Sequence, residues 1–139
     1  ARTVTDLADV LHDLPLEVAC LALVRSVPCV GYRFDIDEKV VTYCTDTGIC
    51  ENAVTLARDA DLLITECGLK PGDKSPLWPH MNPEDAISVA KKAGAKRLAL
   101  MHFGAEVYKT IEERRALKGQ FEAVCPGLVV SEDGMQVEV

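Results

Sequence analysis

The sequence predicts an α/β fold with a mixed sheet, and three observations support this prediction. Short apolar runs at 40–44, 62–65 and 98–101 have the length and composition of strands. The segment 82–93 has apolar residues at helical spacing and separates the last two runs. Asp37-Glu38 is a turn sequence, so the apolar segments on either side of it are expected to pair as an antiparallel hairpin.

The first part of the chain predicts a short helix followed by strands. Residues 7–14 are amphipathic, and Pro15 is expected to end a helix there. The next apolar segments, 17–24 and 29–36, are expected to form strands. A second short helix is expected at 51–59, where small apolar residues recur at helical spacing.

The clearest helix start in the sequence lies at Asn82. Asparagine is a favoured N-cap residue, Pro83 suits the first helical turn, and two acidic residues follow it. Gly94 is expected to end this helix. The preceding segment, 68–78, is rich in proline and glycine and is expected to form a loop around a site.

The C-terminal part of the chain predicts one more helical region and a final hairpin. Residues 107–124 are charged and mostly helical in pattern, with an interruption expected near Gly119. The segments 128–130 and 135–139 are expected to pair as a hairpin around Asp133-Gly134. No internal repeat is apparent.

Composition and charge limit the possible functions. The 139 residues suit a single domain, 1–139, with ordinary hydrophobic (48%) and charged (27%) content. A net charge of −7 argues against binding of nucleic acid through a broad basic surface, although a local basic pocket is compatible with this charge. No apolar run approaches the roughly 20 residues that span a bilayer, so no membrane partner is expected.

The six cysteines indicate a reducing compartment. No C-x-x-C pair is present, so the sequence contains neither a zinc-ribbon nor a thioredoxin motif. We expect the thiols to be reduced and the chain to be cytoplasmic. Four of the six lie in apolar runs, where cysteine behaves as a small buried hydrophobic residue.

Two apolar runs lead into side chains that can bind metals. Asp46 follows the run 41–44, and His102 follows the run 98–101. An open α/β sheet places its chemistry at strand ends, and carboxylate and imidazole groups suit zinc, manganese or iron. The structural alternatives are a turn carboxylate that bonds its own backbone for Asp46, and a hydrogen-bonded core histidine for His102.

Five segments, in order along the chain, resemble motifs of one family. They are Val30–Phe34, Val41–Gly48, Ala60–Cys67, His80–Ala86 and Arg97–Phe103. The resemblance is to the metallo-β-lactamase superfamily, in its ribonuclease Z and cyclic-phosphodiesterase-like branch. It implies half of an αβ/βα sandwich, with a mixed sheet and helices on one face, and this chain matches the C-terminal half of such a fold.

The sequence also departs from the family pattern. The H-x-H-x-D-H motif that supplies most of the family's metal ligands is absent, and the only histidines are His12, His80 and His102. Arg25 stands where the family has a further histidine ligand, and arginine has no lone pair to offer a metal. Of the family's ligand set, Asp46 and His102 remain.

The resemblance implies roles for four residues. Asp46 and His102 correspond to metal ligands, His80 to a catalytic proton donor, and Glu66 to an acid that supports the site. The implied cofactor is Zn²⁺ in a two-metal centre, or manganese or iron. Because two ligands are too few for a stable zinc site, we expect weak or no zinc binding by this chain alone. The structural alternatives are a helix-entry residue for His80 and a buried, paired carboxylate for Glu66.

Five further residues have both a structural and a functional interpretation. Arg25 is either an anion-binding substitute for the missing ligand or a solvated cation at a strand end. Trp78 and Phe103 are expected to pack in a loop and in the core rather than to form a platform for base stacking. Cys44 and Cys67 lie near the presumed site and are the thiols available as replacement ligands.

The function implied by the resemblance is that of a metal-dependent hydrolase acting on a phosphodiester, in RNA or in a small molecule, with its site incomplete in this chain. The alternative is a non-catalytic interaction module that has lost metal binding. A half-sheet exposes an apolar face, so we expect a homo-oligomer or a complex with a separate N-terminal half. The apolar residues assigned to that face are Val18, Leu21, Leu23, Val24, Val30 and Phe34.

Overall fold

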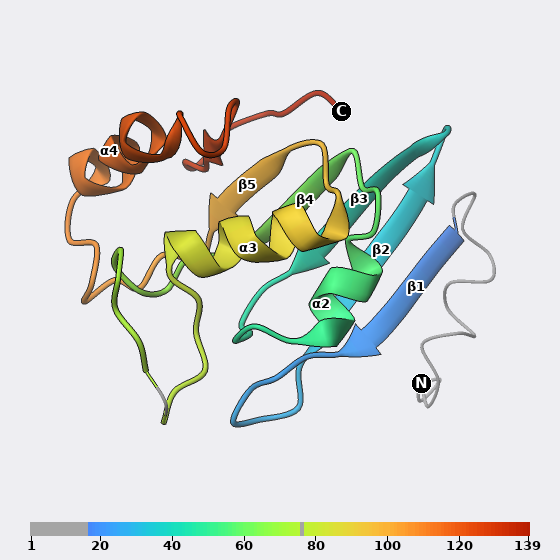
Figure 1. The fold of residues 1–139 in the computed structure, drawn as a ribbon, viewed down its shortest axis with the longest axis horizontal. Helices are drawn as coiled ribbons and strands as arrows, with labels where there is room; N and C mark the ends of the chain where they lie inside the picture. Colours follow the sequence, from blue (N-terminus) through green and yellow to red (C-terminus); the bar gives the residue numbers. More distant parts are fainter. Residues whose placement is uncertain (1–16, 76) are drawn as a thin grey trace, which may run out of the picture.

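The computed structural model describes residues 17–75 and 77–139, which form one mixed sheet with helices packed on it (Figure 1). The sheet has six strands in the order β1-β2-β3-β4-β5-β6. The predicted helix at 7–14 and His12 lie outside the described residues. The elements are β1 Glu17–Ala22, β2 Val30–Ile36, β3 Lys39–Cys44, α2 Glu51–Leu56, β4 Leu62–Glu66, α3 Pro83–Ala93, β5 Leu98–Met101, α4 Ile111–Phe121 and β6 Val129–Val130.

The sheet changes from antiparallel to parallel at β3. Strands β1, β2 and β3 pair antiparallel, and the predicted hairpin between β2 and β3 is confirmed. Its turn residues Asp37 and Glu38 have φ of 49° and 64°, as a tight hairpin with right-handed twist requires. Strands β3, β4, β5 and β6 run parallel, so the carboxyl ends of β3, β4 and β5 meet at one edge of the sheet.

Helices α2 and α3 lie across one face of the sheet (Figure 1). One buried core joins Leu63 and Leu100 of the sheet to Leu56 of α2, Val89 of α3 and Leu117 of α4. The close approach of α2 requires glycine at position 31, because a Cβ there would lie 2.9 Å from Leu56 Cδ1. The prediction of helices on one face of a mixed sheet is confirmed.

Helix α3 begins and ends as the sequence predicts. The Asn82 side chain accepts a hydrogen bond from the Asp85 backbone N–H at 2.8 Å, which is the bond of an N-cap. Gly94 ends the helix in the left-handed conformation, with φ of 69°. Asn82 also donates to the Asp73 carbonyl, so the cap anchors the loop that precedes the helix.

The predicted C-terminal hairpin is wrong. Strand β6 pairs in parallel with β5, because the edge of β5 is free to accept it, and residues 131–139 form no strand. The interruption predicted at Gly119 is also wrong, since α4 runs through it from Ile111 to Phe121. The expected elements at 17–24 and 51–59 are both shorter in the structure.

The apolar residues assigned to one exposed sheet face are divided between its two faces. Leu21 pairs with Gly31, which faces α2, and Leu23 is buried in the same core. Val18 pairs with Phe34. Because side chains alternate between the two faces along a strand, Phe34 lies on the face opposite to that of Gly31, away from α2. The face turned away from the helices is therefore made by a different set of side chains from the set that we predicted.

The C-terminal segment lies against this second face. Met135, Val137 and Val139 border a cavity of about 350 Å³ together with Ile64 of β4 and Met101 of β5. The tail thus contacts the sheet through side chains, without joining it as a strand. None of the helices within 17–75 and 77–139 has the length and apolar character needed to cross a bilayer.

Candidate metal centre and its surroundings

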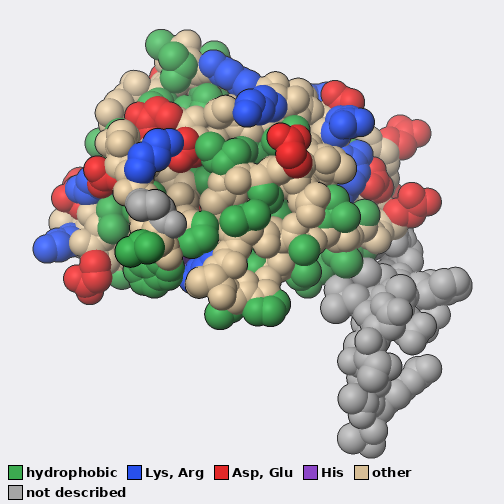
Figure 2. Space-filling model, turned by 60° about the horizontal axis from the view of Figure 1, so that its bottom comes forward, with side chains coloured by type: hydrophobic (Ala, Val, Ile, Leu, Met, Phe, Trp, Pro, Cys, Tyr) green, Lys and Arg blue, Asp and Glu red, His purple; other side chains and the backbone are tan. Residues whose placement is uncertain are grey.

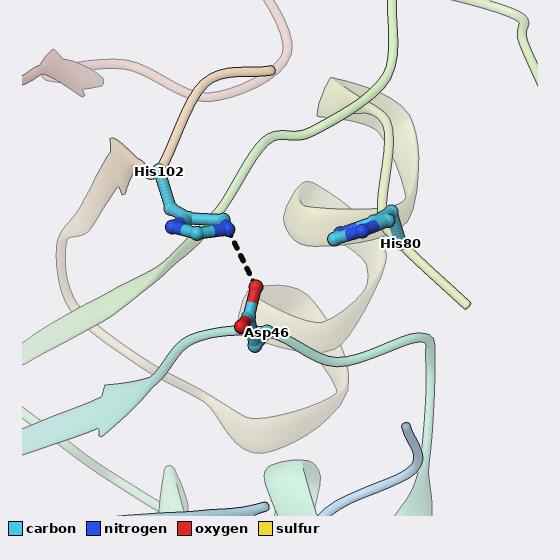
Figure 3. A group of neighbouring side chains, drawn as sticks. All are labelled: Asp46, His80 and His102. Atoms are coloured by element: carbon cyan, nitrogen blue, oxygen red, sulfur yellow. Dashed lines mark ion pairs between the residues drawn. The ribbon is translucent and has the colours of Figure 1, made fainter. Parts of the chain in front are cut away.

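The structure brings the sequence-predicted residues together at the carboxyl ends of the parallel strands (Figure 3). Asp46 follows β3, Glu66 ends β4 and His102 follows β5. His80 enters from the loop between β4 and α3. This edge is where open α/β sheets bind their ligands, and each strand stops because turn residues follow it.

Asp46, His80 and His102 form a compact group. His102 Nε2 lies 2.5 Å from Asp46 Oδ1, and one donor atom from each of the three residues lies within 4.8 Å of the others. The rings of His80 and His102 face each other with centroids 6.1 Å apart and an angle of 21° between their planes. The three side chains point toward one small volume (Figure 3).

Two members of this group have an unusual backbone conformation. Asp46 has φ of 60° and His102 has φ of 49°, in the left-handed region that few residues other than glycine adopt. Both residues directly follow strands, where this conformation turns the chain sharply. Side chains held in such conformations cluster at functional sites.

Glu66 connects the loops that carry the site. Its side chain is fully buried, and its oxygens accept hydrogen bonds from the backbone N–H groups of Thr47 (2.6 Å), Gly68 (3.1 Å) and Met81 (3.2 Å). His80 Nδ1 lies 2.8 Å from Glu66 Oε2. Glu66 therefore fixes the chain next to Asp46, the start of the 68–82 loop and the His80 ring at once, as a buried, paired carboxylate.

Arg25 also belongs to the site, although its contact there was not predicted from the sequence. Its Nη1 forms an ion pair with Asp46 Oδ1, the same oxygen that His102 contacts. The Arg25 side chain is only 14% exposed, and its Nε has no hydrogen-bond partner among the described residues. Arg25 is thus a largely buried cation directed at the carboxylate rather than a solvated cation.

Cys44 and Cys67 do not extend the donor set. Burial raises the pKa of both thiols to about 12, which keeps them protonated at neutral pH. Cys67 Sγ instead lies 3.5 Å from the hydroxyl of Tyr108. The group of Asp46, His80 and His102 does not include either thiol.

The donor set fits one divalent ion. Two imidazoles and one carboxylate are the number and kind of protein ligands that catalytic zinc sites use. This set contains one donor more than the two that we predicted from the sequence. Arg25 opposes metal binding, since an ion at Asp46 Oδ1 has to displace the guanidinium that already contacts this oxygen.

A family model described as a β-lactamase superfamily domain matches residues 6–103. The chain belongs to the metallo-β-lactamase superfamily. Among curated relatives, it is 36% identical over 127 residues to a ribonuclease Z of Methanothermobacter thermautotrophicus, covering 83% of this chain and 40% of that protein. It is 29% identical over 118 residues to the probable metallo-hydrolase YhfI of Bacillus subtilis, covering 83% of this chain and 48% of that protein.

Solved structures of this superfamily share the fold. The crystal structure of Bacillus subtilis YhfI superimposes with a TM-score of 0.74 at 26% identity, covering 87% of this chain and 48% of that one. The human tRNase Z short form gives a TM-score of 0.67 at 24% identity, covering 91% and 44%, and this likeness concerns the fold alone. This chain spans less than half the length of these relatives.

Proposed function

We propose that this chain is the C-terminal half of a metal-dependent hydrolase that cleaves phosphodiester bonds. The observation that carries the proposal is the His80–Glu66 pair beside Asp46 and His102. A histidine held by a buried carboxylate next to a group of metal donors can supply a proton donor beside a metal-activated water, which hydrolysis at phosphorus uses. The ribonuclease Z relatives support a phosphodiester substrate, in RNA or in a small molecule.

Each residue has a distinct role in this proposal. Asp46 and His102 hold a divalent ion, Zn²⁺ or else Mn²⁺ or iron, which supplies an acidified water and charge neutralisation when bound. Glu66 accepts a hydrogen bond from Nδ1–H of His80 and so orients the ring, which in its protonated form carries a second proton on Nε2. His80 then donates a proton from Nε2 to the departing alkoxide, which makes it a better leaving group.

The proposal includes a partner that completes the site. With His80 assigned to proton transfer, Asp46 and His102 supply two ligands, and the metal centre needs further ligands from a separate N-terminal half or from a second copy of the chain. The sheet face turned away from the helices is the surface on which such a partner packs. All six cysteines are free, which supports a reducing compartment such as the cytoplasm.

Metal-dependent hydrolysis is the direct test. Because the chain is expected to bind zinc weakly, the test uses a large excess of Zn²⁺ or Mn²⁺ and a chain concentration at which copies associate. Under these conditions we expect the full chain to release p-nitrophenolate from bis(p-nitrophenyl) phosphate, and chelation to stop this release. The matched control is the chain with Asp46→Asn and His102→Gln together, which lacks both proposed ligands. Equal rates for the chain, the control and the buffer with metal alone would contradict the proposal.

The ion pair between Arg25 and Asp46 favours a second candidate, a non-catalytic interaction module. The guanidinium of Arg25 occupies the position of a metal ion at the carboxylate, and it cannot perform the chemistry of a metal ion. In that case the fold serves to present its sheet face and loops to a partner. In the non-catalytic candidate, Arg25 keeps metal ions away from Asp46, and the affinity for Zn²⁺ in a variant without Arg25 tests this.

Replacing Arg25 by histidine is expected to raise the affinity of the chain for Zn²⁺ at least about tenfold, because the change removes a competing cation and adds an imidazole donor. Calorimetric titration with Zn²⁺ measures the affinity. Arg58→His is the control, since Arg58 is exposed after α2 and adds a surface imidazole away from the site. Unchanged affinity in Arg25→His would show that Arg25 does not limit metal binding, and the non-catalytic candidate would lose its support.

A further inference from the structure

The cavity at the candidate site has a polar end and an apolar end. It has a volume of about 450 Å³, which is the size of a small-molecule site. Arg25, Asp46, His80 and His102 line the polar end. The rest of the lining is mainly apolar and comes from Leu69, Trp78, Phe103, Gly104, Ala105 and Val107.

Trp78 and Phe103 differ in how they line this cavity. The Phe103 ring packs edge-on against Tyr108 with centroids 5.3 Å apart, and the Arg114 guanidinium lies 5.5 Å from its centre. Trp78 is 60% exposed, and its one aromatic neighbour among residues 17–75 and 77–139 is His80, edge-on at 5.3 Å and 83°. Phe103 therefore packs as the sequence predicts, whereas Trp78 presents an open indole next to the histidine that we assign to proton transfer.

Further exposed apolar side chains lie on the loops around Trp78. Leu77 is 92% exposed and Val27 is 60% exposed. These loops are in contact, since the Gly48 N–H bonds the Val24 carbonyl and Gly48 lies against Pro79. Figure 2 shows hydrophobic side chains gathered among polar ones on this lower edge of the molecule. The entrance to the cavity thus favours apolar groups.

Cations near the cavity are already engaged. Lys70 pairs with Glu113 at 3.3 Å, Lys74 pairs with Asp85 at 2.7 Å, and Arg25 pairs with Asp46. Glu106 lines the cavity itself, and the chain carries a net charge of −7. A polynucleotide needs a row of available cations along its backbone, whereas the three cations named here are paired and Arg114 lies over the Phe103 ring.

We propose that the site accepts a small phosphate ester with an apolar aromatic substituent, which stacks on Trp78 while its anionic group lies at Arg25, His80 and His102. This inference rests on the proposed function for the identity of the anion, and it adds the substrate class. The anionic group competes with Asp46 for the Arg25 guanidinium, whose Nε lacks a hydrogen-bond partner among the described residues.

Two ligands with the same anion isolate the contribution of the aromatic ring. Trp78 is the only tryptophan of the chain, so its fluorescence reports binding directly. We expect 1-naphthylmethylphosphonate to bind the full chain at least about tenfold more tightly than methylphosphonate, because the ring adds a stacking contact. A ten-residue oligouridylate is expected to bind no more tightly than uridine monophosphate. Neither phosphonate can be hydrolysed, so the measurement is independent of catalysis.

Variants at Trp78 make the test specific. By calorimetry, Trp78→Ala is expected to reduce the difference between the two phosphonates to about twofold, and Trp78→Phe to retain most of it. Leu77→Ala is the control, because Leu77 is adjacent and exposed but does not line the cavity. Equal affinities for the two phosphonates, or tighter binding of longer RNA, would overturn the inference. Stacking without any hydrolysis would instead support the inference and count against the proposed function.

Discussion

Replacing His80 by alanine is expected to slow phosphodiester hydrolysis by about 10²–10⁴-fold, which is the usual contribution of a general acid. The leaving alkoxide then departs without a proton from Nε2. The fold is expected to survive, because Glu66 keeps its three backbone donors from Thr47, Gly68 and Met81. The loss should therefore appear in kcat rather than in the midpoint of unfolding.

Steady-state kinetics of the metal-loaded chain on a phosphodiester with an alkoxide leaving group measure this effect, and calorimetry of Zn²⁺ binding shows how it arises. Lys74→Ala is the matched control, since Lys74 lies in the same loop and is exposed. If His80→Ala keeps the metal and loses the rate, His80 acts in proton transfer as proposed. If the variant loses the metal as well, His80 is a ligand, and the assignment to proton transfer is wrong.

Replacing Glu66 by alanine is expected to lower the free energy of unfolding by about 3–5 kcal/mol, because several donors lose their acceptor at once. Three buried backbone N–H groups and the His80 ring all bond this carboxylate. Glu66→Gln keeps the shape and one carbonyl acceptor, so it is expected to cost less. The loops around the site should loosen in the alanine variant before the sheet unfolds.

Urea denaturation followed by circular dichroism measures the stability of both variants. Glu17→Ala is the control, because Glu17 is exposed on the edge strand β1 and should change stability by less than about 0.5 kcal/mol. A loss of less than about 1 kcal/mol in Glu66→Ala would show that the backbone donors find water instead, and that Glu66 is not the residue that holds the loops together.

Local patterns predicted the parts of the fold that depend on neighbouring residues. The hairpin turn at Asp37-Glu38 and the cap at Asn82 are set within a few residues, and the structure has both. The C-terminal hairpin failed because Asp133-Gly134 does form a turn, while the partner of β6 is β5, about thirty residues earlier in the chain. Turn chemistry alone does not determine which strand edge is available.

In the candidate site too, features set by local sequence were predicted, and features set by tertiary packing were not. Asp46 and His102 could be expected to converge because parallel strands end at a common edge, and they lie in contact. The contact of Arg25 with Asp46 joins two loops whose packing has no local signature. The bonds of Glu66 to three separate loop positions depend equally on tertiary structure, so the sequence indicated an acid there but not its partners.

The left-handed backbone at Asp46 and His102 has a consequence for engineering this chain. Glycine adopts such a conformation freely, whereas other residues lose about 1–2 kcal/mol in it. Libraries selected only for heat resistance should therefore accumulate glycine at positions 46 and 102, and each such gain deletes a side chain of the candidate centre. Selection for heat resistance favours glycine at these two positions, whereas selection for metal binding favours Asp46 and His102.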